Sequence, residues 1–154
     1  MRKFFKLTAL AAAMLLASVQ FVRPVKTNPP IDPTRTMNAH VLVTPEVEAI
    51  FARSCQDCHS HQTEWPWYSQ IAPASWFVAD HVNHGRKEMN FSAWSNYDRE
   101  HADFLLSNIC RTVKHGMMPL SSYTMLHNSA KLSPRDVQTL CAWSQVERAR
   151  LASR

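Results

Sequence analysis

Three residues that can bind a metal or react with a cofactor stand within five positions, in the run Cys55-Gln56-Asp57-Cys58-His59. The pattern C-x-x-C-H is the attachment signature of c-type haem. Two thiols at this spacing can form thioethers with the two vinyl groups of one porphyrin, and the histidine after them can coordinate the iron through Nε2. The other ring nitrogen then needs an acceptor, often a backbone carbonyl. The motif predicts one haem, covalently attached through Cys55 and Cys58, with His59 as its proximal ligand.

Three other uses of these cysteines fit the sequence less well. A thioredoxin-like redox pair requires a βαβ setting, and the chain shows no such pattern. A zinc site requires a second ligand pair at short spacing, whereas Cys110 and Cys141 are 31 positions apart. A simple disulfide between Cys55 and Cys58 leaves His59 without a role. We therefore favour haem attachment.

The second axial ligand must come from elsewhere, and Gly116-Met117-Met118-Pro119 is the best candidate. A thioether on an extended loop after a helix is the usual distal arrangement, and the proline stiffens the chain beside it. We expect Met118 to be the ligand, with Met117 as the alternative. Both methionines could instead pack against the porphyrin edge without binding iron. Bis-histidine ligation is a further alternative, for which the candidates are His81, His84, His115 and His127.

Aromatic residues follow the motif, and a small helical domain around a porphyrin needs flat apolar walls. Ordinary core packing accounts for most such residues. Arg86 is a candidate partner for a haem propionate, with a solvated surface position as the alternative. The aromatic residues are Trp65, Trp67, Tyr68, Trp76, Phe77, Phe91 and Trp94.

The two remaining cysteines, Cys110 and Cys141, both fall on apolar stripes of predicted helices. In an exported protein they can form a disulfide that joins the two helices. Two buried free thiols are the alternative, because sequence spacing does not reveal the separation of the Cα atoms.

Composition indicates an all-α protein. The chain has 154 residues, of which 45% are hydrophobic and 19% are charged, so it can bury a core. Only two glycines accompany nine prolines, which excludes Gly-rich phosphate loops and Rossmann turns. The net charge is +5, but three of the basic residues precede the apolar N-terminal run. No clustered basic face remains, so we expect no nucleic-acid partner.

Residues 1–24 are predicted to be an export signal, either a signal peptide that is cleaved or a membrane anchor. Arg2, Lys3 and Lys6 precede an uncharged run from Leu7 to Val22, and Arg23-Pro24 ends it. The run lacks a clean A-x-A cleavage site and is slightly shorter than the roughly 20 residues that span a bilayer. Both alternatives place the rest of the chain outside the cytoplasm. We expect it in the periplasm, tethered to the inner membrane if the segment is retained.

Residues 25–43 contain prolines and small polar residues without an apolar stripe, so we expect a tether there. The folded domain is predicted to span residues 44–150. Capping residues and apolar periodicity predict four helices. They begin near Thr44, Pro73, Tyr97 and Ser133, and Gly116 is placed to end the third.

Beyond these motifs, the chain resembles the haem-binding domain family of small exported bacterial C-x-x-C-H proteins. The resemblance covers nearly all of residues 44 to 147 and is more specific than C-x-x-C-H alone. It is carried by Cys55-Gln56-Asp57-Cys58-His59-Ser60, Thr63-Glu64-Trp65-Pro66-Trp67-Tyr68-Ser69, Ile71-Ala72-Pro73, Ser75-Trp76, His81-Val82, Gly85-Arg86, Asn90-Phe91-Ser92-Ala93-Trp94, Gly116, Met118-Pro119, Tyr123, His127, Ala130-Lys131-Leu132-Ser133, Leu140 and Trp143.

The resemblance implies a cytochrome c-like helical fold with one covalent haem and an N-terminal membrane segment. It also implies His59 as proximal and Met118 as distal ligand. The Gly-Met-Met-Pro loop leaves two neighbouring methionines, and Cys110 and Cys141 lie outside the family pattern.

A haem with histidine and methionine ligands has no open site and suits one-electron transfer. The expected partners are electron-transfer proteins of the periplasm or membrane. No catalytic acid-base constellation stands out, so we do not expect an enzyme. The alternatives are a peroxidase-like enzyme, if Met118 does not occupy the iron, and a haem-based sensor domain.

Overall fold

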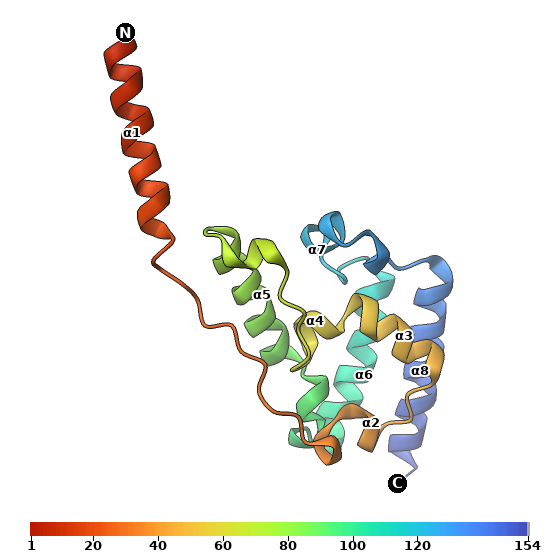
Figure 1. The fold of residues 1–154 in the computed structure, drawn as a ribbon. Helices are drawn as coiled ribbons and strands as arrows, with labels where there is room; N and C mark the ends of the chain where they lie inside the picture. The colour runs from red at the N-terminus through yellow and green to blue at the C-terminus, as the bar shows by residue number, and fades with distance from the viewer. Residues whose placement is uncertain (154) are drawn as a thin grey trace.

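The computed structural model describes residues 1–153, and all regular secondary structure in this range is helical, as the sequence predicts (Figure 1). The α-helices are α1 (Arg2–Val19), α2 (Met37–His40), α3 (Pro45–Ser54), α4 (Gln56–His59), α5 (Ala74–Glu88), α6 (Arg99–Lys114), α7 (Ser121–Leu126) and α8 (Pro134–Ala152). Four short 3-10 turns connect them: η1 (Pro33–Arg35), η2 (Trp67–Gln70), η3 (Phe91–Asn96) and η4 (Asn128–Ala130).

Capping residues set the starts of the long helices. The Thr44 side chain accepts a hydrogen bond from the Val47 amide, and a proline occupies the first turn of α3. Ser133 and Asp136 form a complete capping box at the start of α8. Gly116, just beyond α6, has a φ of 65°, which glycine adopts without strain. The four predicted helices are therefore confirmed, with ends that differ by a few residues.

The core lies where α6 packs along α8, and α8 also contacts α3. Leu106 and Leu140 are fully buried between the two long helices. The Ser144 hydroxyl donates a 2.6 Å hydrogen bond to the Leu106 carbonyl, so the contact also satisfies a buried polar group. The ring of Phe51 on α3 meets Trp143 edge-on, with centroids 5.3 Å apart.

A disulfide joins Cys110 on α6 to Cys141 on α8, with the Cα atoms 4.6 Å apart. The sequence left a disulfide and two free thiols open, and the structure has the disulfide. The disulfide links α6 and α8, the two helices with the most extensive contact in the domain.

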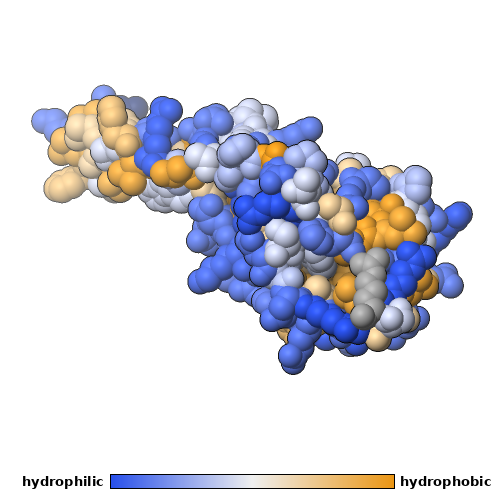
Figure 2. Space-filling view, turned by 90° about the horizontal axis from the view of Figure 1, so that it is seen from below, coloured by the Kyte–Doolittle hydropathy of each residue, from blue (hydrophilic) through white to orange (hydrophobic). Residues whose placement is uncertain are grey.

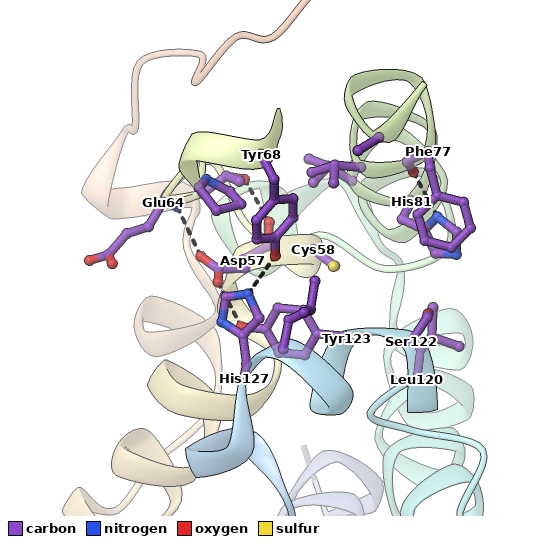
Figure 3. Close-up of a pocket in the computed structure, with 16 residues that line it drawn as sticks. Asp57, Cys58, Glu64, Tyr68, Phe77, His81, Leu120, Ser122, Tyr123 and His127 are labelled. Atoms are coloured by element: carbon purple, nitrogen blue, oxygen red, sulfur yellow. Dashed lines mark hydrogen bonds between the residues drawn. The ribbon is translucent and has the colours of Figure 1, made fainter. Parts of the chain in front are cut away.

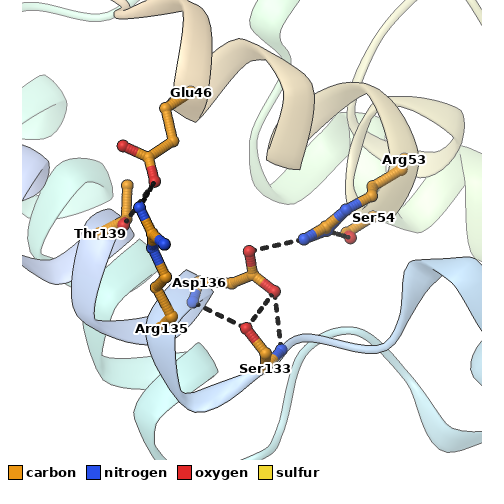
Figure 4. A network of polar contacts seen from close by, with 7 residues as sticks. All are labelled: Glu46, Arg53, Ser54, Ser133, Arg135, Asp136 and Thr139. Atoms are coloured by element: carbon orange, nitrogen blue, oxygen red, sulfur yellow. Dashed lines mark hydrogen bonds and ion pairs between the residues drawn. The ribbon is translucent and has the colours of Figure 1, made fainter.

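A polar network joins the beginning of α8 to both ends of α3 (Figure 4). The Arg53 guanidinium lies 2.6 Å from the carboxylate of Asp136, which also completes the capping box. Arg135 lies 3.6 Å from Glu46 at the other end of α3. The orientation of α3 against α8 is thereby fixed just before the chain enters Cys55.

The expectation of a tether over residues 25–43 needs correction. Met37 and Val41 are 1% and 5% exposed and belong to the core, so the packed domain begins before Thr44. The Leu42 amide donates to the buried Glu147 carboxylate, which ties this segment to α8. A short helix in a proline-rich stretch carries too few apolar residues to show a period, which is why the sequence pattern missed it.

Helix α1 projects from the domain, and none of its residues is buried (Figure 1). Figure 2 shows apolar residues gathered on this projecting segment, whereas the face of the domain turned to the viewer is mostly hydrophilic. Among residues 1–153, no helix has both the length and the apolar character needed to cross a membrane.

Candidate functional site

The C-x-x-C-H motif folds into a single helical turn. Cys55 ends α3, and its carbonyl accepts hydrogen bonds from the amides of Cys58 and His59, at 3.2 and 3.0 Å. Residues at i, i+3 and i+4 of a helical turn share one face. The turn therefore presents both thiols and the imidazole on the same side, which is what attachment and proximal ligation of one porphyrin require.

The His59 imidazole is oriented by the backbone. Its Nδ1 donates a 3.0 Å hydrogen bond to the carbonyl of Met89, the kind of acceptor that the motif predicts. Within the described residues Nε2 has no hydrogen-bond partner. Burial lowers the pKa of His59 despite this bond, which favours the neutral imidazole that binds metals. The Phe91 ring stacks beside it, with centroids 6.0 Å apart.

His59 and Met118 line the same cavity, which has a volume of about 170 Å³. Cys55 also lines it, and apolar residues of α6 and Phe91 form its walls. Met118 is half-buried against the core, whereas Met117 is 43% exposed and does not line this cavity. Of the two methionines, Met118 is thus the one that lines the cavity of His59.

Cys58 lines a second cavity, of about 140 Å³, between η2, α5 and α7 (Figure 3). Its walls include Tyr68, Phe77, Leu120 and Tyr123. Because Pro119 lines the first cavity and Leu120 the second, the loop after Met118 runs along both. Cys55 and His59 therefore border the first cavity, and Cys58 borders the second.

Burial raises the pKa of Cys55 to about 12 and that of Cys58 to about 11. Redox-active C-x-x-C pairs depend on a lowered thiol pKa, so the raised pKa values of Cys55 and Cys58 do not support a thioredoxin-like site. A zinc site is also unsupported, because residues 1–153 contain no cluster of three or more histidine, cysteine or acidic residues that could hold a metal ion.

The histidines considered as distal ligands do not line the His59 cavity. His81 donates from Nδ1 to the Phe77 carbonyl at 2.8 Å, and His127 hydrogen-bonds the Tyr68 hydroxyl through Nε2 at 2.7 Å. His84 lies 3.9 Å from Glu88 on the exposed side of α5, and His115 is exposed at the end of α6.

The Arg86 guanidinium, the predicted partner of a haem propionate, makes four hydrogen bonds within the chain itself. Its guanidinium donates to the carbonyls of Ser60 and Thr27, both at 2.7 Å, and to the side chains of Asn28 and Thr63. These four bonds join α5, the loop after the motif and the N-terminal segment. The sequence indicated only the positive charge of Arg86. It did not reveal these partners, because a backbone carbonyl can belong to any residue type.

Gly85 is a site residue whose role the sequence did not reveal. A Cβ at this position would lie 2.5 Å from the Cys58 carbonyl oxygen, closer than carbon and oxygen can approach without displacement. The missing side chain lets α5 pack directly against α4, and the end of α5 then carries Met89 to His59.

Comparison with protein families matches residues 14–146 to the haem-binding domain family. The chain therefore belongs to this family and is a haem-binding protein. Comparisons with curated proteins and with solved structures give no match.

The residues of this site fit the group that the family binds. The motif turn carries two thiols that can form thioethers with a porphyrin. The His59 Nε2, which has no hydrogen-bond partner among the described residues, shares an apolar cavity with the Met118 thioether, and these are the groups that a covalent haem uses.

Proposed function

We propose that this protein is a c-type cytochrome with a cytochrome c-like fold, which transfers single electrons through one haem attached to Cys55 and Cys58. The observation that carries the proposal is the position of His59 and Met118 in one apolar cavity beside the motif turn. His59 is the proposed proximal ligand and Met118 the distal one.

The haem supplies an iron that changes its oxidation state by one electron. The chain supplies the rest of the chemistry. Met89 holds the His59 ring so that Nε2 is free to bind. Met118 would supply a thioether to the iron, which would raise the reduction potential and leave no open position for a substrate. The apolar residues of α6 around Met118 keep water away, which raises the potential further.

The proposal includes export. The basic start and the apolar run of residues 1–24 support it, and so does the disulfide between Cys110 and Cys141, because disulfides persist outside the cytoplasm. Residues 1–24 would act as a signal peptide. Periplasmic or membrane electron-transfer proteins are the proposed partners.

A redox titration of the purified holoprotein, followed in the visible and near infrared, tests this function. We expect one reversible one-electron transition, a low-spin ferric spectrum with the weak near-infrared band of methionine ligation, and slow binding of carbon monoxide and cyanide. A high-spin haem that binds these ligands at once and turns over peroxide would contradict the proposal and favour a peroxidase-like enzyme. Reversible loss of the methionine band under a gas ligand would favour a sensor.

A further inference from the structure

Helix α7 lies beside the motif although none of its residues is buried. Its Met125 and Leu126 are 79% and 64% exposed. Packing of apolar side chains therefore provides little to hold this helix in place. Its position depends on specific side-chain contacts, and two of these reach the residues around Cys58.

The first contact runs from α7 to the motif itself. The Tyr123 hydroxyl donates a 2.7 Å hydrogen bond to Oδ2 of Asp57, which stands between the two cysteines (Figure 3). The other carboxylate oxygen, Oδ1, accepts a 2.9 Å bond from the Glu64 amide. The bond from Glu64, in the loop that follows the motif, thus holds the Asp57 carboxylate in place for Tyr123. A bond from a hydroxyl to a carboxylate is among the stronger protein hydrogen bonds.

The second contact joins His127, at the end of α7, to Tyr68 in η2. The ring of His127 stacks on Tyr123, with centroids 4.2 Å apart and planes inclined by 12°. Its Nε2 hydrogen-bonds the Tyr68 hydroxyl at 2.7 Å. The stack supports the Tyr123 ring in the orientation in which its hydroxyl reaches Asp57.

Met118 lies on the short loop between α6 and α7. At its α6 end, the loop is held by hydrogen bonds from the amides of Met117 and Met118 to the Thr112 carbonyl, at 2.9 and 3.3 Å. At its α7 end, the bond from Tyr123 to Asp57 joins the helix that follows the loop to the motif. The Met118 loop is therefore fixed at both ends.

We propose that Tyr123 and Asp57 form a latch that keeps Met118 at the distal position of the haem. The two are positioning residues and do not touch the iron. This inference rests on the proposed function, because the latch acts on the proposed distal ligand. When it opens, α7 and the loop separate from the motif, and an external ligand can replace the thioether.

The test compares Tyr123→Phe with the wild-type full-length holoprotein. We expect the imidazole affinity of the ferric haem to rise about 10-fold or more, because loss of a bond to a carboxylate increases the open population. The methionine band should weaken, and hydrogen exchange of the amides in residues 117–127 should accelerate. Thr139→Val is the matched control, since the Thr139 hydroxyl also donates to a carboxylate, that of Glu46 at 3.5 Å, between α8 and α3 and away from the haem site. It should leave imidazole affinity and exchange in this segment unchanged.

A double-mutant cycle with Asp57→Ala completes the test. If the two residues act as one latch, the double variant will bind imidazole no more tightly than the tighter-binding single variant. Unchanged imidazole affinity in Tyr123→Phe, with the methionine band intact, would overturn the latch and leave the proposed function standing. A wild-type protein without methionine ligation would instead overturn the proposed function and, with it, the latch.

Discussion

The imidazole of His59 is held by the carbonyl of Met89, 3.0 Å from its Nδ1 and 30 residues further along the chain. This hydrogen bond ties the haem motif to the end of α5. The close approach of α5 at Gly85 brings that carbonyl within reach. The proposed proximal ligation by His59 therefore depends on how two helices pack, as well as on the motif.

Replacing His59 by alanine tests the proximal assignment. Without its imidazole the iron loses the proposed axial ligand beside the motif turn, so we expect little or no stable holoprotein. Haem per chain, measured by the pyridine haemochrome method, is the readout. His84→Ala is the matched control, because the His84 side chain is 72% exposed, and it should keep full haem content. Equal haem content in the two variants would refute the assignment.

The distal assignment predicts different effects at two neighbouring methionines. Met118→Ala removes the thioether from the His59 cavity, so we expect a high-spin ferric haem, loss of the methionine band and a lower reduction potential. Met117→Ala changes an exposed side chain and should leave the spectrum unchanged. Spectra and redox titrations of both variants measure these effects. If only Met117→Ala altered the spectrum, the ligand would be the neighbouring residue.

The sequence predicted the helix ends and the motif turn, because these features depend on residues close together in the chain. Thr44 and Ser133 start helices because a hydroxyl caps the free amides beside it, and Gly116 ends one because it tolerates a positive φ. The spacing of Cys55, Cys58 and His59 likewise defines one face of a single turn.

What the sequence left unpredicted depends on tertiary contacts. Tyr123 and Asp57 are 66 positions apart, and nothing in the sequence indicates that their side chains form a hydrogen bond. Met37 enters the core from a segment without an apolar period. Arg86 binds mainly backbone and neutral side-chain oxygens, which a search for a charged partner does not consider.

Gly85→Ala tests the close contact between α5 and α4. The added Cβ would meet the Cys58 carbonyl at 2.5 Å, so the helices must separate, and we expect a loss of about 1–3 kcal/mol in the free energy of unfolding. Urea denaturation measures it. At Gly116 nothing lies within 4 Å, so Gly116→Ala incurs only the backbone strain of a positive φ, about 1–2 kcal/mol. Gly85→Ala should also disturb the haem spectrum, and an unaltered spectrum would contradict the proposed link to His59.

Asp136 predicts a pH-dependent stability. Burial acts to raise its pKa, but hydrogen bonds from Ser133 and Arg53 outweigh burial and hold the pKa below its ordinary value of 3.8. The stabilisation is therefore present above about pH 4 and is lost as the pH falls through the lower pKa of the folded state. We expect Asp136→Asn to cost about 1 kcal/mol at pH 7, and the cost to shrink as the pH falls below about 4.

Urea denaturation of the wild type and Asp136→Asn across this pH range measures the difference. The exposed Asp80 on α5 provides the control, and Asp80→Asn should change the stability by less than about 0.5 kcal/mol throughout. A penalty for Asp136→Asn that stays constant down to pH 2 would show that the carboxylate charge is not what stabilises the start of α8.

The intact mass of the protein, purified from a host that matures c-type cytochromes and then denatured, tests covalent haem attachment most directly. We predict the mass of the polypeptide plus one haem, which persists after acid and organic solvent have removed any free cofactor. Cys55→Ala with Cys58→Ala should lose that addition. A denatured wild-type chain with the mass of the polypeptide alone would contradict the account.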